Sequence, residues 1–183
     1  MNTRKLAYSS LFVALGIVLP VVFSSVGLSQ VLLPAHVPVL LAGFVCGPVA
    51  GMLVGVLSPI LSAILIGIPS LAPPLAQVAA VELAIYGLLT GLFYERLHAG
   101  VYVSLLGAMF AGRAVYGVLA YLILPMFGVP QVPLWAPLIG AISIALPGVV
   151  AQIICIPPMF SLIRRRMKAS PTAKRRPGRC PRG

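Results

Sequence analysis

The sequence predicts an all-α integral membrane protein, a bundle of six transmembrane helices. Charged residues make up only 8% of the 183-residue chain and hydrophobic residues 60%, and the mean hydropathy is +1.09. A soluble domain carries about a quarter charged residues. The apolar residues also fall in long runs, without the strict alternation shown by the strands of a membrane β-barrel. We therefore expect helices, in a chain long enough for one domain.

The six predicted membrane helices form a membrane domain over residues 1–163 and span residues 6–23, 37–47, 49–67, 75–94, 100–124 and 136–163. A bilayer core of about 30 Å requires roughly 20 apolar residues per helix. The second run is shorter than this, and Gly47-Pro48 separates it from the third. A short segment beside a proline is tolerated in a membrane where protein surrounds it. The second and third helices are therefore expected inside the bundle, the third with a kink near Pro59.

Another arrangement of this stretch joins residues 37–57 into one helix and leaves 58–68 as a re-entrant segment. That arrangement would put Arg96 and the basic C-terminal residues outside the cell. Because basic loops favour the cytoplasmic side, we expect six spans instead, with a tight inner turn at Gly47-Pro48. Both chain termini then lie in the cytoplasm.

Residues 164–183 consist largely of Arg, Lys, Pro, Gly and Ser and account for most of the net charge of +11. This composition predicts a disordered, basic cytoplasmic tail. Attraction to anionic membrane lipid is its expected consequence. No nucleic-acid partner is expected, since neither aromatic residues nor a folded module accompany the charge.

Four glycines, Gly43, Gly47, Gly51 and Gly55, recur at every fourth position through the second and third spans. On a continuous helix they would form a flat ridge that another helix can approach closely. Helix packing is the preferred interpretation of this pattern.

Only two residues inside the predicted spans carry a formal charge, Glu82 and Arg113. At about 1.5 Å per residue, both lie in the outer half of the membrane at a similar depth. Intramembrane ionisable residues are costly and indicate a functional site. Two interpretations remain open: a structural ion pair between two helices, or polar anchors in an outward-opening cavity that binds a polar substrate.

The other candidate substrate-binding residues are aromatic neighbours of these charges or polar residues towards the outer ends of the spans: Tyr86, Tyr116, Gln77, Ser58, Ser62 and His36. Tyr86 and Tyr116 each follow a charge by about one turn. For His36 a solvated position in a loop is the alternative. Gln152, deep in the last span, is expected to form a hydrogen bond between helices.

Nothing in the sequence indicates catalysis. The chain contains no Asp, two Glu and two His, and it lacks metal-ligand spacings, the nucleophile motif of hydrolases and phosphate-binding glycine loops. We therefore expect no enzyme activity, no metal and no cofactor. Energy for uphill transport would have to come from another chain.

Residues 36–48 (HVPVLLAGFVCGP), continuing through Gly51 and Gly55 to residues 58–62 (SPILS), resemble the substrate-binding S components of energy-coupling-factor (ECF) vitamin transporters. Residues 82–87 (Glu-Leu-Ala-Ile-Tyr-Gly), 112–117 (Gly-Arg-Ala-Val-Tyr-Gly) and the Pro147-Gly148, Gln152 and Ile156-Pro157 pattern are also similar. The resemblance covers about residues 6–163.

This resemblance implies six helices, a vitamin cavity that opens outwards, and no ATPase within the chain. The implied partners are a membrane coupling protein driven by two cytoplasmic ATPases, on which the S component docks and topples to release its substrate. In the family an A-x-x-x-A motif on the first helix mediates docking. Here Ser10 and Ala14 occupy those positions, and a serine still permits close packing.

The predicted function is capture of a small water-soluble vitamin or vitamin precursor at the plasma membrane of a prokaryote. Arg113 would suit a carboxylate, as in pantothenate. Glu82 would suit an amino or protonated heteroaromatic group, as in hydroxymethylpyrimidine or a pyridoxine-like molecule. The alternative is a non-transporting membrane scaffold, in which the ion pair and the glycines only hold the bundle together.

Overall fold

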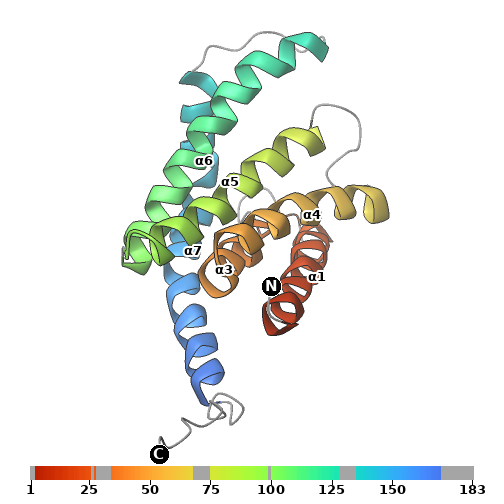
Figure 1. Cartoon of the computed structure of the whole chain (residues 1–183). Coiled ribbons are helices and arrows are strands. Elements are labelled where there is room, and N and C mark those ends of the chain that lie inside the picture. Colours follow the sequence, from red (N-terminus) through yellow and green to blue (C-terminus); the bar gives the residue numbers. More distant parts are fainter. Residues whose placement is uncertain are drawn as a thin grey trace, which may run out of the picture.

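A computed structural model describes residues 3–25, 27, 34–67, 75–98, 100–127 and 135–169. The predicted all-α class is confirmed. In these ranges the chain forms the following helices (Figure 1): α1 (Thr3–Ser25), α3 (His36–Cys46), α4 (Pro48–Ile66), α5 (Leu75–Glu95), α6 (Val101–Ile123), the 3-10 helix η1 (Leu124–Phe127) and α7 (Trp135–Ala169).

Each predicted membrane run coincides with one α-helix. Within the described ranges, α1, α4, α5, α6 and α7 contain five segments long and apolar enough to cross a bilayer. Helix α3 has only 11 residues, too few for a full crossing by itself. Helix α7 continues past residue 163 to Ala169, so the first residues of the predicted tail are helical; residues 170–183 lie outside the described part. The number of spans and the cytoplasmic location of the termini remain predictions.

The short helix α3 lies inside the bundle. Nine of its 11 residues are buried, and it packs against α1, α4, α5 and α7. Helix α4 differs, because Val49, Leu53, Leu57 and Ile64 are exposed along one face. The predicted interior position is therefore right for α3, whereas only one face of α4 is covered by protein.

Gly47 makes the turn between α3 and α4. Its φ of 95° lies in the left-handed region, which glycine adopts without strain. Pro48 is the first residue of α4, where its fixed φ and missing N–H are tolerated. The alternative of one helix over residues 37–57 is therefore excluded. Helix α4 continues through Pro59 to Ile66.

The glycine pattern brings two helices into backbone contact with α5. A methyl group on Gly43 of α3 would lie 2.6 Å from the carbonyl oxygen of Gly87, and one on Gly51 of α4 would lie 2.5 Å from the same atom. Further along α4, Gly55 faces the backbone of Leu83. The spacing thus serves helix packing, as expected, although the chain turns at Gly47 and the glycines converge on α5 from two separate helices.

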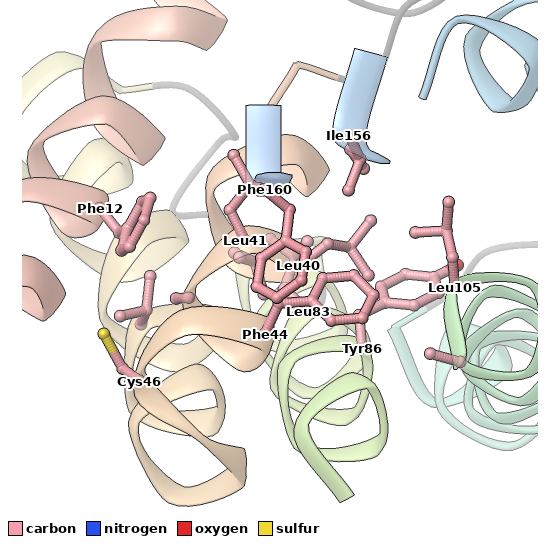
Figure 2. Close-up of a cluster of buried hydrophobic side chains, with 14 of the residues drawn as sticks. Phe12, Leu40, Leu41, Phe44, Cys46, Leu83, Tyr86, Leu105, Ile156 and Phe160 are labelled. Atoms are coloured by element: carbon pink, nitrogen blue, oxygen red, sulfur yellow. The ribbon is translucent and has the colours of Figure 1, made fainter. Parts of the chain in front are cut away.

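Helix α5 is central, since it packs against α3, α4 and α6. Helix α7 packs against α3 and α6, and its last turns extend beyond the other helices towards the C-terminal end (Figure 1). The buried side chains of these helices form one apolar cluster (Figure 2), which includes Leu40, Phe44, Leu83, Tyr86, Leu105, Ile156 and Phe160.

Replacement of Gly87 by alanine should disrupt the contact between α4 and α5, because the new methyl group would overlap the backbone of Gly51. Overpacking against backbone atoms should cost at least about 2 to 3 kcal/mol of unfolding free energy. Thermal unfolding in mild detergent measures this as a lower Tm. Gly100→Ala is the matched control, since no atom lies within 4 Å of its new methyl group. Equal Tm values for the two variants would contradict the proposed role of the contact.

Candidate functional site

The carboxylate of Glu82 is the centre of a buried polar group formed by three helices. Its Oε1 accepts a hydrogen bond from the hydroxyl of Tyr86 at 3.0 Å and lies 3.2 Å from Nη1 of Arg113 on α6. His36, the first residue of α3, places its Nε2 3.9 Å from the same oxygen. We call His36, Glu82, Tyr86 and Arg113 the Glu82 cluster.

Local sequence explains how the cluster is assembled. Glu82 and Tyr86 are four residues apart on α5 and therefore share one face of that helix. Gly112, next to Arg113, allows α6 to approach closely, because a methyl group there would lie 2.5 Å from Cε1 of Tyr86. The ring of Tyr86 also packs against that of His36, with centroids 4.9 Å apart. Tyr86 is thus enclosed on both sides and its hydroxyl is directed at Glu82.

The two charges of the cluster differ in their accessibility. The side chain of Glu82 is 8% exposed and that of Arg113 is 20% exposed. A buried carboxylate requires a compensating charge, which Arg113 supplies. The guanidinium pairs with Glu82 through Nη1 and is the more exposed side chain of the two. Arg113 is therefore the charged group that an incoming molecule can reach more easily.

His36 differs from its expected alternative, a solvated loop histidine. It begins α3 and is 7% exposed. Neither ring nitrogen has a hydrogen-bond partner among the described residues, since 3.9 Å from Glu82 is too long for a hydrogen bond. The histidine is therefore a buried, unsatisfied member of the cluster.

The remaining predicted residues lie elsewhere or at the margin. Tyr116 is half-buried on α6, about one turn from Arg113, and Gln77 is exposed near the start of α5. Ser58 and Ser62 are buried on α4. The hydroxyl of Ser58 faces α1, where a methyl group on Gly16 would lie 2.5 Å from its Oγ.

The hydrogen bond between helices that was predicted for Gln152 is not found in the described part of the chain, so this prediction is wrong there. Its side chain is 1% exposed, yet neither amide atom has a hydrogen-bond partner there. Sequence reasoning places a glutamine deep in a span but cannot show which neighbours face it.

Sequence reasoning also missed a group of contacts at the opposite end of the bundle. Phe44, Tyr94 and Phe160, from three helices, pack with ring centroids 5.2 to 5.4 Å apart. The hydroxyl of Tyr94 accepts a hydrogen bond from Nη1 of Arg164 at 3.0 Å. No local motif signals a contact between residues so far apart in sequence.

The same end contains a hollow of about 390 Å³, lined by Lys5, Cys46, Gly47, Pro48, Val49, Ala50 and Glu95. The ammonium group of Lys5 and the carboxylate of Glu95 are 3.9 Å apart, and both side chains are about half exposed. These side chains form no buried polar group comparable with the Glu82 cluster.

The Glu82 cluster is suited to binding a polar molecule. It offers a partly exposed cation, a buried carboxylate and an imidazole without hydrogen-bond partners, but no nucleophile paired with a base. No group of three metal-ligating side chains is found in the ranges that the structure describes. The arrangement can therefore hold a charged or hydrogen-bonding ligand by electrostatic attraction and directed hydrogen bonds.

Apolar helices around an enclosed charged cluster define a multi-pass membrane protein with a polar site between its helices. Residues 4–160 match the family of the ECF transporter, substrate-specific component, and the chain belongs to this family. The resemblance noted in the sequence is thereby confirmed. The family is a class of transporter subunits, not of enzymes. Comparisons with curated proteins and with solved structures gave no match.

Removal of one member of the ion pair should destabilise the protein strongly. In Arg113→Gln the carboxylate of Glu82 stays buried without its cation, at an expected cost of about 3 kcal/mol. The double variant Glu82→Gln/Arg113→Gln should be more stable than Arg113→Gln alone, because no buried charge remains. Thermal unfolding of both variants tests this prediction.

Glu95→Gln is the control, because it breaks the half-exposed pair with Lys5 and should cost less than about 1 kcal/mol. A Tm for Arg113→Gln close to that of Glu95→Gln would show that Glu82 does not depend on Arg113.

Proposed function

We propose that the protein captures a small water-soluble vitamin or vitamin precursor at the Glu82 cluster and delivers it through an ATP-driven ECF module. Membership of the substrate-specific family supports the transport role. The observation that supports this location is the buried ion pair between Glu82 and Arg113, next to an imidazole whose nitrogens are unsatisfied. Buried polar groups are normally hydrogen-bonded, so imidazole nitrogens without hydrogen bonds support a ligand-binding role for this cluster.

The chemistry of the cluster fits the three vitamin classes expected from the sequence. A carboxylate, as in pantothenate, would bind the guanidinium of Arg113. An amino or protonated ring group, as in hydroxymethylpyrimidine or a pyridoxine-like molecule, would bind the carboxylate of Glu82. Tyr116, half-buried beyond Arg113, is a candidate wall for either ligand, and Gln77, Ser58 and Ser62 remain outer candidates.

The alternative function is a non-transporting scaffold in which the ion pair only joins helices. It is favoured by the short distance between the two charges, which compensate each other without a ligand. It leaves the unsatisfied nitrogens of His36 without an explanation. Substrate capture is therefore the better conclusion.

Docking on the partner module is proposed for the exposed face of α1. Ser10 and Ala14 are both exposed and one turn apart, and they lie among the exposed residues Leu6, Leu11, Leu15 and Val18. The hydroxyl of Ser10 donates to the carbonyl of Ala7 at 2.9 Å. Its hydrogen-bonding capacity is thus met within the helix, so the serine presents a small surface on which another helix can pack closely. The proposed partners are a membrane coupling protein and two cytoplasmic ATPases, in the plasma membrane of a prokaryote.

Binding should occur with the chain alone. We expect mass spectrometry of the wild-type chain, purified in mild detergent, to detect a co-purifying vitamin. Arg113→Ala and Glu82→Ala should each weaken its binding at least about tenfold, which corresponds to 1.4 kcal/mol. Glu95→Ala, at the other end of the bundle, serves as the charge-removal control. Folded variants of both cluster residues with wild-type affinity would refute the site.

Docking should be separable from binding. Ala14→Trp places a bulky ring on the exposed face of α1 and should abolish uptake in cells, while the isolated chain keeps its affinity for the vitamin. Phe110→Trp is the control, because Phe110 is 73% exposed on α6 and should still support uptake. Loss of ligand binding in Ala14→Trp would instead assign α1 a role in shaping the site.

A further inference from the structure

Three buried side chains in the described structure have polar atoms without hydrogen-bond partners: His36, Ser58 and Gln152. Ser58 has a single hydroxyl and packs against Gly16 of α1. His36 and Gln152 each have two such atoms, and Gln152 is the more deeply buried of the two, at 1% exposure against 7%.

An unsatisfied amide in such a place is costly. Burial removes its hydrogen bonds to water, and nothing in the described residues replaces them. An apolar side chain of the same size would pack there without this cost. The glutamine at this position is therefore a candidate for binding a ligand through its amide.

The packing of α3 against α7 indicates where Gln152 faces. Phe44 of α3 and Phe160 of α7 are in ring contact, with centroids 5.2 Å apart. Two turns before Phe44 lies His36, and two turns before Phe160 lies Gln152. Both helices pass through the same apolar cluster on the way, at Leu40 and at Ile156.

Figure 2 shows Ile156 pointing from α7 into the cluster that contains Leu40, Tyr86 and Leu105. Gln152 precedes Ile156 by one turn and shares its face of α7. Both side chains are fully buried, so Gln152 lies on the side of α7 that faces the core. Helix α7 packs against α3 and α6, the two helices that carry His36 and Arg113 of the Glu82 cluster.

We propose that Gln152 is a substrate-binding residue and that the site takes a small carboxylate that also carries an amide or hydroxyl group. This inference rests on the proposed function and narrows its substrate class. The carboxylate would bind Arg113, the more exposed of the two cluster charges, in the bidentate manner that guanidinium favours. The neutral group of the ligand would satisfy Gln152 and His36, since an amide side chain both donates and accepts.

Titration calorimetry with the full chain in detergent tests the substrate class with two matched probes. Pantothenate carries a carboxylate, an amide and hydroxyls, while panthenol replaces only the carboxylate by an alcohol. We expect the wild-type chain to bind pantothenate at least about tenfold more tightly than panthenol. Equal affinities, or binding of hydroxymethylpyrimidine or pyridoxine in preference to both, would overturn the carboxylate assignment while leaving vitamin capture intact. A chain that binds none of these probes would refute the proposed function and this inference together.

Gln152→Met tests the glutamine through two readouts. Without ligand, Tm should rise by about 2 to 4 °C, because an unsatisfied amide is replaced by an apolar side chain of similar size. Affinity for the vitamin should fall at least about tenfold. A structural hydrogen bond would give the opposite change in Tm, and an unchanged affinity would remove Gln152 from the site. His36→Phe provides a second variant for the affinity measurement.

Two controls separate these effects from general changes in packing. Ile154→Met introduces the same side chain two residues further along α7, at a position 65% exposed, and should change neither Tm nor affinity. Thr90→Val removes a buried hydroxyl that does have a partner, the carbonyl oxygen of Tyr86 at 2.6 Å. It should not raise Tm. A rise in Thr90→Val equal to that in Gln152→Met would show that any buried polar deletion stabilises this bundle, and would overturn the argument.

Discussion

The backbone contact between α5 and the pair α3–α4 is the constraint on which the rest of the structure depends. Gly43 and Gly51 meet the carbonyl of Gly87, and Gly55 meets that of Leu83. Because glycine has no side chain to separate the helices, α5 is fixed in depth and rotation against α3 and α4. Glu82 directly precedes Leu83, so the same contact fixes the position of its carboxylate beside His36.

The buried carboxylate then constrains the rest of the site. A carboxylate in a membrane bundle needs a compensating charge, which α6 supplies through Arg113. Gly112 permits this approach by leaving room for the ring of Tyr86. The glycine contacts and the pairing of Glu82 with Arg113 therefore favour the same arrangement of α3, α5 and α6. Such consistency between packing and electrostatics is typical of a well-specified fold.

The sequence predicted the helices and the similar depth of Glu82 and Arg113 because both depend on local information, and it left open whether the two charges pair. Hydropathy is a property of consecutive residues, and counting residues from the span ends put Glu82 and Arg113 at one depth. The burial of His36, the unsatisfied amide of Gln152 and the contact between Tyr94 and Arg164 depend on neighbours from distant segments. The spacing of residues along the chain does not determine these contacts. The sequence could therefore identify candidate residues but could not predict their contacts.

The two ends of the bundle differ in how their polar groups are satisfied, and this difference bears on function. Near Gly47 the ionic contacts, such as that between Lys5 and Glu95, are half exposed and contribute little to stability. Around Glu82 the charges are enclosed, yet His36 retains unsatisfied nitrogens. A scaffold has no reason to keep such groups, because replacing them with apolar residues would stabilise it. In a binding protein such groups contribute to specificity, because molecules that leave these buried groups without hydrogen bonds bind poorly.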